Sequence, residues 1–319
     1  TVDVKQKTNV SENDYTLTIT GTGNYTGKIK NVKWNITPMK IDSVMVSSAA
    51  VISKVYDGTA KINMTAEEWA GILEFRPSSA SATVAVPIGA YTISDASFIE
   101  NRNGEYFDSP DTGEKYGIAF NIMLKSNNYV LQNYYDDEPA LSKDYVQSGG
   151  ADFTITKATY NMTGVKFEDA SYTYDGSEKT LTISGTLPTG VTVAYENNKL
   201  TNAGSVTAKA KFTIADSNNY CAIKDMTATL TITKAKPTVS ISAKPDSLRG
   251  GGKVTLTVTG VPSEGTAIVT CDNGITVDNA NGTYSAVLPN RTVDYTFTLN
   301  YTGVENGNYS DATDTCTVS

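Results

Sequence analysis

Apolar and polar residues alternate with a period of two along many short segments of this chain. The alternation is clearest in Thr154–Ala158 and Thr231–Ala235, which both read T-I-T-K-A, and Asn35–Lys40 is a looser version. A period of two is typical of a strand with one buried face. Gly, Asn, Asp and Ser, which favour turns, separate these segments. The chain is therefore predicted to be mainly β.

One segment, residues 65–75, has the periodicity of a helix instead. Thr65 and Glu68 have the Thr-x-x-Glu spacing of a capping box. Trp69 and the aliphatic residues three and four positions after it form one apolar face. We expect a helix over 65–75 that packs on a mostly antiparallel sheet, which is an α+β arrangement.

Two short motifs recur along the chain. Tyr-Asp-Gly occurs twice, each time before a small hydroxyl residue, and an Asn-Tyr pair preceded by Gly or Asn occurs four times, each time ahead of an alternating strand. Recurrence in a fixed order indicates tandem modules. The motifs are Tyr56-Asp57-Gly58, Tyr174-Asp175-Gly176, Asn24-Tyr25, Asn128-Tyr129, Asn219-Tyr220 and Asn308-Tyr309.

These markers divide the chain into four segments. Residues 1–38 hold only the closing half of a unit, so we expect the chain to start inside a repeat of a longer protein. Residues 39–157 form a long unit and residues 158–235 a compact one. Residues 236–319 lack Tyr-Asp-Gly, and their strand spacing resembles that of an immunoglobulin-like sandwich. Short joins with a nearby proline favour a semi-rigid, extended chain. We expect it to be monomeric.

The Tyr-Asp-Gly motif has a structural and a chemical interpretation. Asp-Gly between β-type residues is a strong hairpin signal, because Gly accepts a positive φ and Asp bonds to the turn backbone. A catalytic or glycan-binding pair would need further groups that recur with Tyr and Asp, and none do. Tyr56, Asp57, Gly58, Tyr174, Asp175 and Gly176 are therefore predicted to be turn markers, with each ring at the edge of the core.

Composition excludes several classes of function. The net charge of -8 leaves no basic face for nucleic acid, and scattered Lys and Arg offer no site for an anionic membrane. No apolar run is long enough for membrane insertion. The absence of histidine removes Ser-His-Asp catalysis and His-ligated zinc. We expect no enzymatic activity, although a glycosidase that uses two carboxylates needs no histidine and stays open.

Cys271 and Cys316 fall in the same segment, so a disulfide between them is one alternative. Buried free thiols are the other, which the burial habit of free cysteine favours. In an immunoglobulin-like fold their strands would flank a third strand, which weakens the case for a bridge.

The motifs resemble the YDG and MBG ("mostly β-grasp") repeat modules of bacterial cell-surface proteins. The last segment is similar to the bacterial immunoglobulin-like modules of the same proteins. The resemblance implies a β-grasp-like α+β unit at 39–157, a compact MBG-like unit at 158–235 and a β-sandwich at 236–319. It also implies a secreted or surface-attached, adhesin-like stalk or spacer with no catalytic motif or obligatory cofactor. Its partner would be a host or matrix glycan or protein.

The long unit has 119 residues against 78 in the compact one, and this excess of 41 residues is where a specific site is expected. It includes the helix and two loops, 100–117 and 132–150. Aromatic residues in these loops could bind a glycan or protein: Tyr106, Phe107, Tyr134 and Tyr135. Acidic residues could bind Ca²⁺, although solvated loops are the simpler interpretation: Asp108, Asp111, Glu114, Asp136, Asp137 and Glu138.

Overall fold

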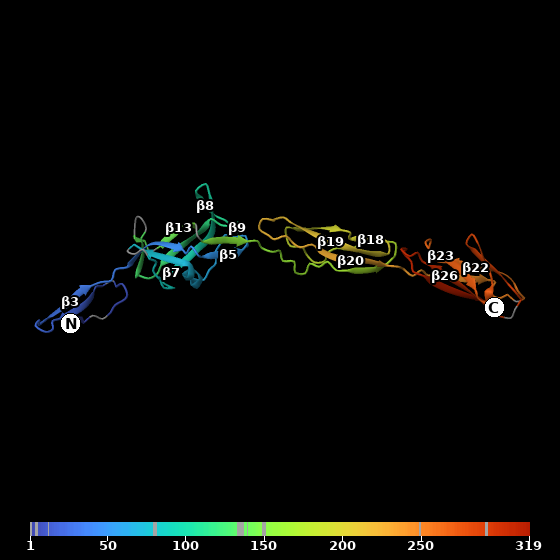
Figure 1. Cartoon of the computed structure of the whole chain (residues 1–319), viewed down its shortest axis with the longest axis horizontal. Coiled ribbons are helices and arrows are strands. Elements are labelled where there is room, and N and C mark those ends of the chain that lie inside the picture. Colours follow the sequence, from blue (N-terminus) through green and yellow to red (C-terminus); the bar gives the residue numbers. More distant parts are fainter. Residues whose placement is uncertain are drawn as a thin grey trace. The chain divides into compact units, whose positions relative to one another are not determined.

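The computed structural model describes residues 1–319 except 1, 4–5, 12, 79–81, 133–136, 139, 149–150, 249 and 291–292. Its contacts form two compact units. The first contains residues 1–159 and 216–221, and the second contains residues 160–215 and 222–319. Strands dominate both units, so the predicted mainly β class is confirmed (Figure 1). Within the described residues, no helix has the length and apolar character that a membrane crossing requires.

The first unit begins with a small antiparallel sheet of order β1-β2-β3 and continues with three further sheets. Their orders are β13-β10-β7-β8, β12-β11-β4-β6 and β5-β14-β9. Two pairs are parallel, β11 with β4 and β14 with β5. The strands are β1(Val2–Asp3), β2(Tyr15–Thr20), β3(Lys28–Trp34), β4(Met39–Val46), β5(Val51–Val55), β6(Leu73–Pro77), β7(Tyr91–Arg102), β8(Glu105–Asp108), β9(Gly113–Glu114), β10(Gly117–Leu124), β11(Tyr129–Gln132), β12(Asp137–Glu138), β13(Ala140–Ser148) and β14(Asp152–Thr156).

The helix of this unit, α1(Ala66–Ile72), starts as predicted and ends earlier. The Thr65 side chain accepts a hydrogen bond from the Glu68 N–H and the Glu68 carboxylate accepts one from the Thr65 N–H, so the capping box is present. The expected end at residue 75 is wrong because residues 73–77 form β6, which pairs antiparallel with β4. Phe75, which lies within the predicted helix, is only 3% exposed in β6, so pairing in the sheet buries it.

The second unit begins with a sheet of order β15-β20-β19-β17 and a separate β16-β18 pair. Strands β15 and β20 are parallel, whereas β19 and β20 are antiparallel neighbours joined by a loop. The strands are β15(Ala170–Thr173), β16(Lys179–Thr180), β17(Val191–Glu196), β18(Lys199–Leu200), β19(Gly204–Ile214) and β20(Met226–Thr233).

The last segment of the second unit has two sheets, of order β21-β22-β25-β24 and β23-β26-β27. Taken in chain order as strands A to G, these are the ABED and CFG sheets of a constant-type immunoglobulin domain. The immunoglobulin-like sandwich is therefore confirmed by strand order. Its elements are β21(Ser240–Lys244), β22(Gly252–Thr259), β23(Thr266–Cys271), the 3₁₀ turn η1(Asp272–Gly274), β24(Val277–Ala280), β25(Thr283–Leu288), β26(Tyr295–Thr302) and β27(Ala312–Val318).

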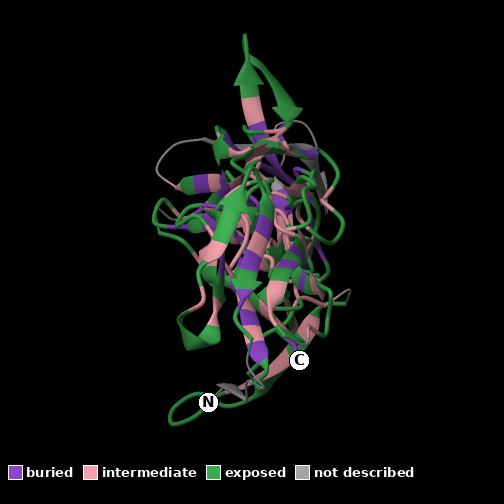
Figure 2. Ribbon diagram, turned by 90° about the vertical axis from the view of Figure 1, so that its right-hand side faces the viewer, coloured by how far each residue is buried: buried purple, intermediate pink, exposed green. Residues whose placement is uncertain are grey.

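Buried and exposed residues alternate along single strands, as Figure 2 shows. In β26 buried and half-buried residues alternate without a break from Tyr295 to Tyr301. Among the residues whose burial the structure describes, the buried ones form three separate hydrophobic clusters, which draw on residues 41–155, 167–230 and 239–318. The cluster of residues 167–230 is the smallest and is built around Leu181, Ala208, Ala228 and Leu230. Each cluster therefore serves its own stretch of chain.

Candidate functional site: the Asn-Tyr junctions

Each Tyr-Asp-Gly motif follows a strand that pairs in parallel with the last strand of its own segment, β5 with β14 and β15 with β20. The Tyr56 N–H donates to the Thr156 carbonyl, and the Tyr174 N–H donates to the Thr233 carbonyl. The chain after the motif does not return as an antiparallel partner of the strand before it. The expected hairpin is therefore wrong, and the motif is a turn at the end of a parallel pair.

The Asp of the motif folds this turn. The Asp57 carboxylate accepts bonds from the Thr59 N–H at 2.9 Å, the Thr59 hydroxyl at 2.8 Å and the Lys54 Nζ at 2.7 Å. The Lys54 bond, followed by those of Thr59, lowers the pKa of Asp57 to about 2. Gly58 takes a φ of 81°, which a side chain would disfavour.

The second motif repeats this arrangement, with a lysine that follows the motif in the chain instead of preceding it. The Asp175 carboxylate accepts from the Ser177 N–H and hydroxyl at 2.9 and 2.6 Å, and from the Lys179 Nζ at 2.6 Å. The Lys179 bond is the main cause that lowers the pKa of Asp175. Both oxygens of Asp175 and the Oδ1 of Asp57 thus bond groups in or beside their own turn.

The segment 216–221 belongs to the first unit and docks beside the Tyr56 turn. The Ala158 N–H donates to the Asn219 carbonyl at 2.9 Å, and the Cys221 N–H donates to the Ala158 carbonyl at 2.8 Å. The Asn219 Oδ1 accepts from the Thr112 N–H at 2.9 Å, and its Nδ2 donates to the Asp111 Oδ1 at 3.2 Å. Asn219 is 7% exposed, so this amide is both buried and bonded.

The loop that joins β26 to β27 makes the same contacts within the second unit. The Ala235 N–H donates to the Asn308 carbonyl at 2.9 Å, and the Ser310 N–H donates to the Ala235 carbonyl at 2.9 Å. The Asn308 Oδ1 accepts from the Ala203 N–H at 2.8 Å, and its Nδ2 donates to the Asn202 Oδ1 at 3.5 Å.

A third copy lies at Asn128. The Met39 N–H donates to the Asn128 carbonyl at 2.9 Å. The Asn128 Oδ1 accepts from the Val10 N–H at 2.8 Å, and its Nδ2 donates to the Asn9 Oδ1 at 3.0 Å.

These three contacts, centred on Asn128, Asn219 and Asn308, share one design, and we call them the Asn-Tyr junctions. In each, the asparagine carbonyl binds the chain where the preceding segment ends. Its side chain bonds two consecutive residues, an N–H and the side-chain oxygen one residue earlier. The receiving pairs are Asn9-Val10, Asp111-Thr112 and Asn202-Ala203. A side-chain amide used in the same way three times is a recognition element.

Two of the junctions also pair tyrosines. The rings of Tyr56 and Tyr220 lie 5.6 Å apart at 77°, and those of Tyr174 and Tyr309 lie 5.5 Å apart at 82°. Edge-to-face packing of this kind is favourable for aromatic rings. Burial, followed by the nearby Asp216 charge, raises the pKa of Tyr56. The tyrosine of each Tyr-Asp-Gly motif therefore packs against the tyrosine of an Asn-Tyr pair.

The repeated T-I-T-K-A segments complete these two junctions. The Lys157 Nζ donates to the Ser217 carbonyl at 2.6 Å. The Lys234 Nζ donates to the Val304 and Glu305 carbonyls, both at 2.7 Å. The lysine thus holds the approaching loop, and the alanine after it forms the short parallel bridge.

The exposed aromatic residues predicted for ligand binding lie partly on the β7–β8 hairpin, which extends from its unit in Figure 1. Tyr106 is 47% exposed and its ring lies 5.5 Å from that of Tyr116. Phe107 is 42% exposed and stacks with the Arg102 guanidinium at 5.6 Å. Tyr134 and Tyr135 lie outside the described residues.

The acidic residues proposed as Ca²⁺ ligands do not share one point. Asp108 accepts a bond from the Ser97 hydroxyl at 2.6 Å, and Asp111 serves the Asn219 junction. Glu114 lies exposed in β9. Asp137 and Glu138 form β12, and Asp136 is outside the described residues. Over the part of the chain that the structure describes, no three Asp, Glu, His or Cys residues are grouped as a metal site.

Cys271 and Cys316 are free and lie in β23 and β27, where both pair with Phe297 of the intervening strand β26. Two strand spacings, about 10 Å, separate them, which exceeds the reach of a disulfide. The alternative of a bridge between them is thus wrong. Burial raises the pKa of Cys271 to about 12 and also raises that of Cys316.

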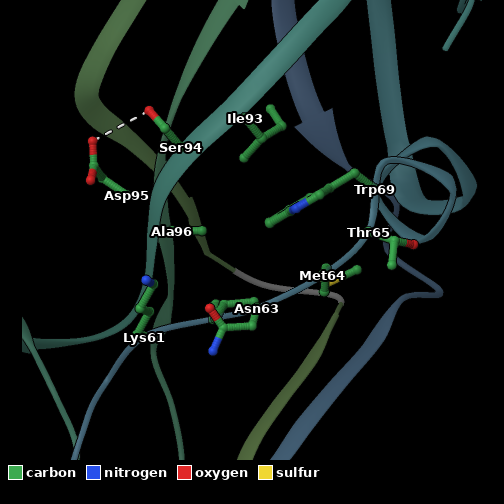
Figure 3. A pocket seen from close by; sticks show the side chains of 10 residues that line it. Lys61, Asn63, Met64, Thr65, Trp69, Ile93, Ser94, Asp95 and Ala96 are labelled. Atoms are coloured by element: carbon green, nitrogen blue, oxygen red, sulfur yellow. Dashed lines mark hydrogen bonds between the residues drawn. The ribbon is translucent and has the colours of Figure 1, made fainter. Parts of the chain in front are cut away.

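A pocket of about 600 Å³ lies beside the start of α1, and Figure 3 shows its lining. Trp69 and Ile93 form its apolar side, and Asp95 lies at its rim. Asp95 has a φ of 53° at a bulge between β7 and β10, and its carboxylate accepts a bond from the Asn121 amide at 2.8 Å. A neighbouring pocket of about 590 Å³ shares Lys61 and Asp95. No sequence motif predicted either pocket.

Neither a family model nor a curated protein matches this chain. Among solved structures, it is similar to the extracellular cadherin domains 1–4 of protocadherin gamma B7, at 8% identity and a TM-score of 0.26, over 97% of this chain and 83% of that one. The N-terminal eight Ig domains of Down Syndrome Cell Adhesion Molecule match at 10% identity and a TM-score of 0.26, over 100% of this chain and 42% of that one. The titin domains Z1Z2, solved in complex with telethonin, match at 18% identity and a TM-score of 0.28, over 51% of this chain and 96% of that one. These scores do not assign the chain to a family.

Proposed function

We propose that this chain is a non-catalytic, extracellular segment of a bacterial surface or adhesin-like protein, and that it acts as a stalk or spacer. The repeated Asn-Tyr junction carries this proposal. A catalytic centre would be expected once in a chain. Here the same contact of a buried or half-buried asparagine occurs three times, and each copy binds two consecutive segments together. The resemblance of the motifs to YDG and MBG modules supports a surface location.

The mechanism follows from the contacts of the junction. Each asparagine replaces bonds to water with bonds to backbone and side-chain groups of the preceding segment, and leaving any of these groups unpaired costs about 1–3 kcal/mol. The tyrosine pair adds about 0.5–1.5 kcal/mol. Together they restrict bending where a proline-containing join alone would allow it.

Hydrogen exchange in the whole chain tests this role of the junction. Asn308→Ala should speed exchange of the Ala203 N–H, which Asn308 holds, by tenfold or more. Asn306→Ala is the matched control, because Asn306 is an exposed asparagine of the same loop. Equal exchange at Ala203 in both variants would remove the basis of the proposal.

Solution scattering tests the stalk itself. We expect an elongated profile for the whole chain, and a broader distribution of lengths for Asn308→Ala. A compact, globular scattering profile for the unmodified chain would contradict a role as a spacer.

A second candidate function is glycan or protein binding by the inserted loops 100–117 and 132–150. The observation in its favour is the pair of exposed aromatic groups on the β7–β8 hairpin, Tyr106 with Tyr116 and Phe107 with Arg102. Binding on a glycan array that is lost in Tyr106→Ala or Tyr134→Ala would support it. Val287→Ala, which changes an exposed apolar residue of another segment, is the control.

A further inference from the structure

The fourth Asn-Tyr pair, Asn24-Tyr25, has a place in its sheet like that of Asn308-Tyr309 and lacks the contacts of the three junctions. It lies in the loop between the antiparallel strands β2 and β3, as Asn308-Tyr309 lies between β26 and β27. Asn24 is exposed and Tyr25 is 80% exposed. Among the residues that the structure describes, neither side chain has a hydrogen-bond or ring partner.

This loop and the loop of the Asn308 junction each contain a close approach between a glycine and the tyrosine carbonyl. A Cβ on Gly21 would lie 2.9 Å from the Tyr25 carbonyl oxygen. A Cβ on Gly303 would lie 2.1 Å from the Tyr309 carbonyl oxygen. In both loops the residue directly after the first strand is a glycine, which leaves room for the tyrosine carbonyl.

We propose that Asn24-Tyr25 is the free half of a further junction, and that its partner is a module of the Tyr-Asp-Gly type. By analogy with the Asn219 and Asn308 junctions, the partner supplies a Tyr-Asp-Gly turn for the Tyr25 ring, a closing strand that ends in Lys-Ala, and a receiving pair with an Asx residue. In this chain the two surfaces of that type are already covered, by Tyr220 and by Tyr309. A second copy of the chain therefore has none to offer, and the partner is a further module.

This inference rests on the proposed role of the junctions. It adds that recognition resides in a short loop, so that one docking loop can replace another. An 80% exposed tyrosine at a loop tip fits this role, because tyrosine is enriched among the residues that dominate interfaces.

A loop exchange within the whole chain tests this directly. Residues 216–221 (DSNNYC) are replaced by residues 21–26 (GTGNYT), which have the same length and place Asn and Tyr at the same positions. The loop groups that bind Lys157 and the Thr112 hydroxyl are carbonyls, so the exchange keeps them. The control chain receives the same loop with Asn24→Ala and Tyr25→Ala.

The readout is hydrogen exchange at the Thr112 and Ala158 N–H groups, both of which bond Asn219 in the native loop. The inference expects rates within about threefold of the native chain for the GTGNYT loop, and at least tenfold faster exchange for its alanine control. Equally fast exchange in both chains would overturn it and leave Asn24-Tyr25 an ordinary surface turn.

Asn219→Ala in the native loop separates this failure from failure of the proposed function. If that change leaves the exchange rate of the Thr112 N–H unaltered, the junction does not stabilise the contact, and the proposed function is contradicted as well. If the exchanged chain does not fold, the same six residues in place of residues 305–310 (ENGNYS), read at Ala203 and Ala235, give the same two outcomes.

Discussion

Asp57 shows how one carboxylate determines the form of a turn. Its Oδ1 bonds Lys54 and both the N–H and the hydroxyl of Thr59, so this oxygen is committed to the turn. The recurrence of Tyr-Asp-Gly is thus explained by the turn and by the tyrosine that it presents to the Asn-Tyr loop.

The charge of Asp57 should make the turn sensitive to acid. Its pKa in the folded chain is about 2, below the ordinary value of 3.8, so its contribution is complete above pH 4 and is lost as pH falls toward 2. The difference in urea midpoint between the native chain and Asp57→Asn should shrink over this range. Because the side chain is about half exposed, we expect less than about 1 kcal/mol. A difference that stays constant from pH 5 to 2 would contradict the prediction.

The cysteines differ in accessibility. Cys221 is exposed, whereas burial raises the pKa of Cys271 and Cys316. At pH 8 a thiol reagent should modify one cysteine of the native chain quickly and the other two only after denaturation, because the thiolate is the reactive form. Cys221→Ser should abolish the fast reaction. A fast reaction that survives this change would show the burial argument to be wrong.

At the scale of elements, the Asn-Tyr loops depend on backbone space as well as on side chains. Gly303→Ala places a methyl group 2.1 Å from the Tyr309 carbonyl oxygen, which forces the loop to move. We expect a loss of about 1–3 kcal/mol in the stability of the second unit, typical of overpacking.

Gly71→Ala in α1 is the matched control for that change. Gly71 has nothing within 4 Å of an added Cβ, and alanine in a helix is worth about 0.5–1 kcal/mol over glycine. This variant should therefore be stabilised, as measured by urea denaturation. Equal effects of the two substitutions would argue against a crowded loop at Gly303.

Helix α1 shows where local signals suffice and where they do not. Its start is written in the sequence, because a capping box needs only Thr65 and Glu68. Its end is set by the pairing of β6 with β4, a contact between residues about 30 positions apart that no window of sequence contains.

At the scale of the whole molecule, three separate hydrophobic clusters imply that the stability of each segment depends on its own cluster. Phe120 is fully buried in the first cluster, so Phe120→Ala should cost that segment about 3–5 kcal/mol. Met123 of the same strand is 52% exposed, and Met123→Ala should cost little. Hydrogen exchange should speed at Ile122 and stay unchanged at Leu299 of another cluster. Matching changes at both sites would contradict separate cores.

The sequence by itself determined the β character, the helix start and the repeated motifs, because alternation, capping and recurrence are local properties of a chain. It also pointed to the strand order of the last segment, which followed from the spacing of its turns. Tertiary structure alone decided what the motifs do. The receiving pairs Asp111-Thr112 and Asn202-Ala203 lie about 100 residues from the asparagines that they bind, and Asp111 had looked like a metal ligand. Hydrogen-bond partners at such separations are chosen by packing, which no local pattern records.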